Sequence, residues 1–139
     1  MKIKRLAFIL AIAAAAAVLA ACGNTTAVTI QNEKLTFLKA EVESGYEEIA
    51  PAEGNQILAV RFLAENENPD LSVITEGFFG GNPSVLTSGA NTYACKSIAF
   101  ENDNGRIIAV PVFEVPATPK GGATYTLSGD AFKSIQFVV

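Results

Sequence analysis

The chain has 139 residues, which suits one domain and is too short for two. Its formal net charge is −4 and it contains no histidine, so the usual general base and the usual zinc ligand are both missing. The acidic balance disfavours nucleic acid and anionic lipid headgroups as partners.

The N-terminus has the layout of a secretory signal peptide. Three basic residues occur within the first five positions, and a run of 16 residues, 6–21, follows without a charge or a polar side chain. A membrane-spanning helix needs about 20 apolar residues, so this run is short for that role. Removing the three basic residues from the total of −4 leaves the remaining chain at −7.

The end of the apolar run resembles the lipobox of bacterial lipoproteins. It reads Leu19-Ala20-Ala21-Cys22, with an aliphatic residue, two small residues and then cysteine. The resemblance implies diacylglyceryl attachment to the Cys22 sulfur and cleavage before it. Three alternatives remain: an ordinary signal peptidase cut after Ala21, a cysteine there by chance, or an uncut segment that anchors the protein in the membrane.

The expected organisation has three parts. Residues 1–21 form the signal peptide, residues 22–34 hold the lipidated cysteine and a tether, and residues 35–139 form the folded domain. A first edge strand at residues 27–30 is the alternative to a plain tether. The predicted location is extracytoplasmic and lipid-anchored, in the outer membrane if the cell is Gram-negative, because Gly23 is not the aspartate linked to inner-membrane retention.

The rest of the chain predicts strands. Residues 35–42 are β-prone, with Phe37 and Val42 as inward candidates, and residues 57–64 alternate as a half-buried strand should. A tight hairpin turn is predicted within residues 101–106 from Asn-Gly. The other expected strands cover residues 73–79 (weaker), 92–100, 107–115, 124–127 and 134–139. Pro111 suggests a sheet edge or a bulge in the strand that contains it.

These elements predict an all-β, Ig-like antiparallel β-sandwich of about seven strands. No amphipathic helix is expected after the signal peptide, and the strand order around residues 77–90 is left open. The tryptophan of immunoglobulin domains is missing, because the chain has no Trp. With Cys22 acylated, Cys95 has no partner for an intramolecular disulfide.

Two segments resemble the Ig-like domain of unknown function, family number 4352, of bacterial lipoproteins. They read NQILAVRFLAENENPD, residues 55–70, and GRIIAVPVFEVPAT, residues 105–118. The matching positions are Val60, Phe62, Glu65, Asn66, Gly105, Val112, Phe113, Glu114, Val115 and Pro116. The resemblance covers residues 27–139 and implies a lipid anchor and a compact β-sandwich, with no catalytic residues to transfer.

Several side chains are candidates for chemistry or contact. Cys95 is interpreted as a buried, inert thiol, because Lys96 points to the other face of a strand. A solvated acidic stretch is expected at Glu41, Glu43, Glu47, Glu48 and Glu53. Phe78 and Phe79 precede two glycines, and two outcomes are open: both rings are packed, or one lies in the core and the other is exposed for contact with a partner.

A calcium site is a second possibility at residues 65–70, where oxygen ligands alternate. Its candidate ligands are Glu65, Glu67 and Asp70, although the stretch lacks the glycine and final glutamate of an EF-hand. A turn with capping side chains explains the same residues, and no resident metal or cofactor is expected.

The sequence therefore favours a non-enzymatic, membrane-anchored domain that binds a protein or cell-envelope partner. The alternative is a small-molecule or calcium-binding sensor or transport-accessory lipoprotein. An enzyme would need a mechanism based on carboxylates alone.

Overall fold

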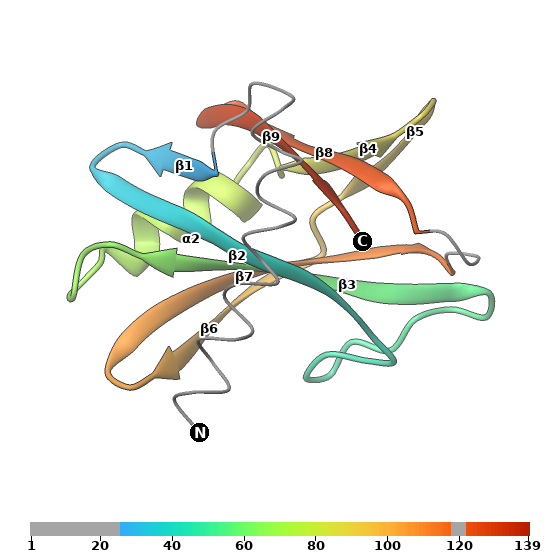
Figure 1. Ribbon diagram of the computed structural model, residues 1–139, viewed down its shortest axis with the longest axis horizontal. Coiled ribbons are helices and arrows are strands. Elements are labelled where there is room, and N and C mark those ends of the chain that lie inside the picture. The colour runs from blue at the N-terminus through green and yellow to red at the C-terminus, as the bar shows by residue number, and fades with distance from the viewer. Residues whose placement is uncertain (1–25, 118–121) are drawn as a thin grey trace.

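The computed structural model describes residues 26–117 and 122–139 and has two antiparallel sheets that face each other (Figure 1). The five-stranded sheet has the order β1 (Ala27–Ile30), β2 (Glu33–Glu43), β3 (Asn55–Ala64), β7 (Arg106–Pro116), β6 (Ser97–Asp103). The four-stranded sheet has the order β5 (Asn91–Ala94), β4 (Val85–Ser88), β8 (Thr124–Gly129), β9 (Phe132–Val138). The predicted all-β sandwich is confirmed, with nine strands in the part of the chain that the structure describes.

The main core fills the space between the two sheets and closes at one end against a helix, α2 (Leu71–Phe79). Aromatic rings connect the layers. Phe37 of β2 stacks on Phe137 of β9 with ring centroids 5.4 Å apart, and Phe62 of β3 stacks on Phe78 of α2 at the same separation. Each such pair adds about 0.5–1.5 kcal/mol to the stabilisation from burial.

Strand β3 is buried on both faces, which corrects the prediction of a half-buried strand. Leu58, Val60 and Phe62 face the main core, as the alternation predicts. Ile57 and Ala59 point the opposite way into a second apolar cluster on the outer face of the five-stranded sheet. The prediction was wrong because residues 44–54 return over this outer face, which a two-residue periodicity does not reveal.

Helix α2 occupies residues for which a strand was predicted, and the prediction was wrong there. The Asp70 side chain accepts hydrogen bonds from the backbone N–H groups of Ser72 and Val73, which makes it the N-cap. The helix buries Ile74, Gly77 and Phe78 on one side. A helix of only nine residues gives a short periodic signal, and its β-branched residues mimic a strand.

Residues 92–100 were predicted as one alternating strand and instead form parts of two. β5 belongs to the four-stranded sheet and β6 to the five-stranded sheet, with Cys95 and Lys96 between them. The Cys95 N–H donates to the carbonyl of Ser84 on one side of this crossing, whereas the Lys96 N–H donates to Val112 on the other. Alternation persists through the crossing, so the sequence pattern does not reveal the change of sheet.

The predicted hairpin turn is confirmed between β6 and β7, where Asn104 and Gly105 have φ values of 57° and 83°. The expectation that Pro111 marks a sheet edge or bulge is wrong, because β7 lies between β3 and β6. Two pairs flank Pro111 in the same register with β3: Ala59↔Val112 and Phe62↔Ala109. The hydrogen-bonded pairing of β7 with β3 is interrupted at Pro111, which has no N–H to donate, but the register of the two strands is the same on both sides.

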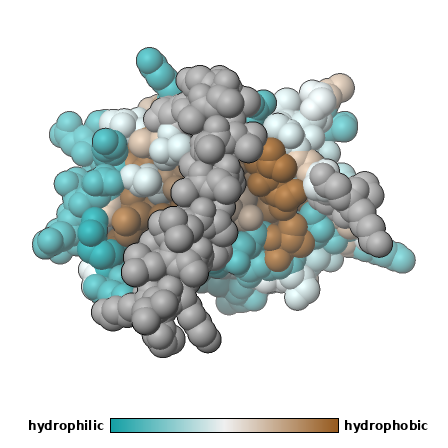
Figure 2. Space-filling model, in the orientation of Figure 1, coloured by the Kyte–Doolittle hydropathy of each residue, from teal (hydrophilic) through white to brown (hydrophobic). Residues whose placement is uncertain are grey.

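The N-terminal edge of the five-stranded sheet begins earlier than residue 35. β1 pairs with β2 over four positions, from Ala27↔Thr36 to Ile30↔Glu33. Phe37 is partly buried against the core, as expected, but Val42 is 46% exposed and was wrongly expected to point inward into a core. Figure 2 shows hydrophobic residues near the middle of the face seen in Figure 1, with hydrophilic residues around them.

We predict that Gly77→Ala destabilises the protein by about 1–3 kcal/mol. A Cβ atom at position 77 would come within 2.7 Å of two side-chain carbons of Ile30, which is buried. This overlap outweighs the gain of about 1 kcal/mol that alanine brings to a helix. Urea unfolding measures the difference, and Gly81→Ala is the control because its added Cβ has nothing within 4 Å. A Gly77→Ala protein as stable as the natural one would contradict the prediction.

Candidate functional site

The lipobox-like residues Leu19, Ala20, Ala21 and Cys22 lie outside the described residues, and lipid attachment at Cys22 stays a prediction. The described chain begins at Thr26, whose carbonyl accepts a hydrogen bond of 2.7 Å from the Phe37 N–H. The chain therefore enters the domain at the edge of the five-stranded sheet, four residues after Cys22.

Phe78 and Phe79 divide between core and surface. Phe78 is fully buried, and its ring lies 5.4 Å from that of Phe132 as well as that of Phe62. Phe79 is 41% exposed. Of the two outcomes left open, the structure shows one residue in the core and one at the surface, and the cause is the rotation of about 100° between consecutive helical residues rather than strand alternation.

The three candidate calcium ligands already have roles within the fold. Glu65 accepts a hydrogen bond of 2.6 Å from the Thr36 hydroxyl, and Asp70 caps α2. The side chain of Glu67 is exposed. Across residues 26–117 and 122–139, no group of three or more His, Cys, Asp or Glu side chains is placed to hold a metal ion.

The segment of residues 65–70, which precedes α2, is held by a side chain that sequence reasoning missed. Glu33 of β2 is buried and accepts hydrogen bonds from the Asn66 side chain at 2.8 Å and from the Asp70 backbone N–H at 3.0 Å. A carboxylate on a neighbouring strand therefore fixes the start of α2. The separation of 37 residues between Glu33 and Asp70 left no local signal for this contact.

Cys95 is a buried thiol, as expected. Its Sγ donates to the Ser97 carbonyl at 3.1 Å. Burial raises the pKa of Cys95 above its ordinary value, so the thiol stays protonated and weakly nucleophilic. The Lys96 ammonium lies 4.0 Å from a Glu114 oxygen.

An ion-pair cluster lies on the outer face of the five-stranded sheet, centred on Arg61. Its guanidinium, in a side chain only 12% exposed, contacts Glu41 at 2.8 Å, Glu43 at 3.1 Å and Glu101 at 3.0 Å. It also lies 5.8 Å from the centre of the Tyr46 ring. Glu41 and Glu43, expected in a solvated stretch, instead neutralise a partly buried cation.

Two members of this cluster, Glu101 and Tyr46, have shifted pKa values. The hydrogen bond from Arg61, followed by that from the Tyr46 hydroxyl at 2.7 Å, holds the pKa of Glu101 below its ordinary value. Burial, together with the acceptor Glu101, raises the pKa of Tyr46 above its ordinary value. Since neither group changes its protonation near neutral pH, the cluster fixes structure rather than moving protons.

The cluster also secures residues 44–54 over the sheet. The Tyr46 ring belongs to the second apolar cluster, and its hydroxyl reaches Glu101 on β6. Further along, one oxygen of Glu114 accepts from the Ala52 N–H and the Asn55 amide, both at 2.8 Å. These hydrogen bonds, with that of Asn55 first, lower the pKa of Glu114. The carboxylates of Glu101 and Glu114 thus hold residues 44–54 near both ends of this segment.

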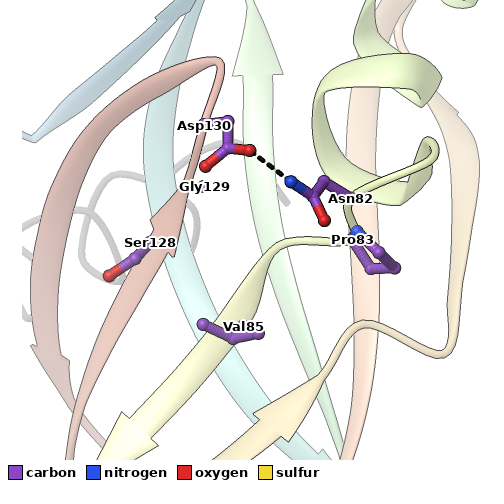
Figure 3. A pocket seen from close by; sticks show the side chains of 6 residues that line it. All are labelled: Asn82, Pro83, Val85, Ser128, Gly129 and Asp130. Carbon is purple, nitrogen blue, oxygen red and sulfur yellow. Dashed lines mark hydrogen bonds between the residues drawn. The ribbon is translucent and has the colours of Figure 1, made fainter.

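A shallow pocket of about 270 Å³ lies at one end of the sandwich (Figure 3). It is formed where the segment after α2 meets the turn between β8 and β9, and its lining residues are Asn82, Pro83, Val85, Ser128, Gly129 and Asp130. The Asn82 amide donates to the Asp130 carboxylate at 2.5 Å and joins the two walls. No sequence pattern indicates this pocket, because the residues Asn82 and Asp130 on its two walls are 48 positions apart in the chain.

Comparison of the chain with protein-family models, curated proteins and solved structures finds no match. The resemblance to family number 4352 stays a prediction that rests on the two quoted segments. Within the described ranges, no helix has the length and apolar character needed to cross a bilayer.

We predict that Glu101→Gln lowers the free energy of unfolding at pH 7 by about 1 kcal/mol, a value discounted for partial exposure of the ion pair. The folded-state pKa of Glu101 is below its ordinary value of 4.5, so its stabilisation is present above that pH and is lost as pH falls through the folded-state pKa. The gap between natural protein and variant should close over this acidic range.

Urea unfolding at a series of pH values from 7 to 3 tests this prediction. Glu53→Gln is the matched control, since it removes one negative charge from an exposed position. If both variants show the same stability difference from the natural protein at every pH, the assigned role of the Arg61–Glu101 pair is wrong.

Proposed function

We propose that the protein is an extracytoplasmic lipoprotein, anchored through Cys22, whose β-sandwich binds a protein or cell-envelope partner without catalysing a reaction. The observation that carries the proposal is the sequence Leu19-Ala20-Ala21-Cys22, which ends the apolar run of 16 residues that follows a basic start. Four residues from Cys22 to Thr26 span at most about 14 Å, so the anchored domain stays close to its membrane.

Lipid rather than charge holds the domain at the membrane in this proposal. One acyl chain gives only marginal binding, whereas two give stable attachment, because each buried methylene contributes roughly 0.8 kcal/mol. The chain from Cys22 onward carries a formal charge of −7, as counted above, so anionic headgroups repel it. In a Gram-negative cell the expected location is the outer membrane.

Binding rather than catalysis is supported by the available side chains. The chain has no histidine, and the thiol of Cys95 is buried with a raised pKa. A large apolar side chain, Phe79, is exposed on α2, and Leu71 at the start of the same helix is 40% exposed. Since Phe78 is fully buried, Phe79 takes the role of contact residue.

Metabolic labelling with an alkyne fatty acid tests the anchor. We expect the natural protein to carry the label and Cys22→Ala to lose it and to accumulate as the uncleaved precursor. Cys95→Ser is the matched control, because it removes the other cysteine of the chain and leaves the lipobox-like sequence intact. Equal labelling of the natural protein and Cys22→Ala would refute lipid attachment at this residue.

A further inference from the structure

The loop after α2 is closed by one buried serine. The backbone N–H and the hydroxyl of Ser84 both donate to the Phe78 carbonyl at 2.8 Å, and Ser84 is fully buried. The chain therefore turns back within residues 79–83, with exposed Phe79 at one end and Asn82 of the pocket at the other. The Cα atoms of Phe79 and Asn82 lie within about 11 Å of each other, because only three peptide steps join them.

Helix α2 presents a partly apolar face to solvent beside this loop. Leu71, Thr75 and Phe79 lie within an arc of about 80° around the helix axis, next to the exposed polar residues Ser72 and Glu76. Two of the four large hydrophobic side chains that are exposed among the described residues belong to this face. The end of the helix, the closed loop and the pocket thus form one continuous stretch of surface, here called the α2 surface.

Helix α2, the closed loop and the pocket lining carry only negative formal charges. Within residues 71–83 and the pocket lining, the charged side chains are Glu76 and Asp130, and there is no lysine or arginine. Asp130 supplies the one formal charge among the six pocket-lining residues, and its carboxylate is directed at Asn82 along the upper wall of the pocket in Figure 3.

We propose that the α2 surface docks a polypeptide segment of the partner that places an apolar side chain on Phe79 and a lysine or arginine in the pocket at Asp130. This inference rests on the proposed function, which it deepens by naming the surface and the chemistry of the partner. The negative charge of the α2 surface disfavours an anionic membrane surface as the occupant. A volume of about 270 Å³ is below the 300–1,000 Å³ of ordinary small-molecule sites.

Photo-crosslinking in intact cells of the source organism tests the proposal on the full, lipidated chain. Benzoylphenylalanine replaces Phe79 in one strain and Val138 in the control strain, because Val138 is 55% exposed on β9 of the four-stranded sheet. We expect a protein adduct from position 79 and none from position 138. Mass spectrometry of the adduct should identify a partner peptide with lysine or arginine within a few residues of the crosslinked position.

Charge variants test the pocket in the same strain. Asp130→Asn keeps the shape of the side chain and removes its charge, and we expect about tenfold less adduct, as for the loss of a central contact. Glu53→Gln, remote in sequence and exposed, is the control and should leave the adduct unchanged.

An adduct from position 138 alone would overturn the α2 surface and leave partner binding intact. A crosslinked peptide without a basic residue, an adduct with lipid only, or equal adducts from natural Asp130 and Asp130→Asn would also overturn this proposal. No adduct from position 79 in cells where Cys22 is labelled would overturn docking on the α2 surface and keep the anchor.

Discussion

The side chains of β3 pack in both directions, and the two apolar layers of the protein meet at this strand. Leu58, Val60 and Phe62 fill the space between the sheets, while Ile57 and Ala59 support the segment that covers the outer face. A strand buried on both faces contributes to two clusters at once, so disruption of its pairing with β2 or β7 removes apolar contacts from both. The helix and the outer segment therefore depend on the same strand for their position.

One strongly polar side chain on this strand, Arg61, determines how the outer layer is arranged. A cation placed among apolar neighbours is costly unless it is paired, and carboxylates from β2 and β6 supply the pairing. Because Glu101 also accepts from Tyr46, the same contacts that neutralise the arginine hold residues 44–54 in place. The contacts that neutralise Arg61 therefore also position the outer segment. Their net contribution to stability is modest, because the site is partly exposed.

The sequence predicts those features whose causes are local. The turn at Asn104-Gly105 follows from backbone conformations that these residues favour, and the fold class follows from repeated alternation. Residues 73–79 and 92–100 were misread because a nine-residue helix and a crossing between sheets produce no distinctive period. The site was only partly predictable: Phe79 stood out beside its glycines, but the pocket walls and the partners of Arg61 are brought together only by tertiary contacts between distant segments.

The burial of Cys95 has a consequence for covalent association between molecules. In the proposed extracytoplasmic location, where disulfides form readily, an accessible thiol could link two copies of the chain. The Cys95 thiol is instead buried where the chain crosses between the sheets. Its backbone N–H donates a hydrogen bond to the Ser84 carbonyl, and its Sγ donates one to the Ser97 carbonyl. Burial of the thiol at this crossing therefore limits the access of oxidants, and of a second copy's thiol, to Cys95 in the folded protein.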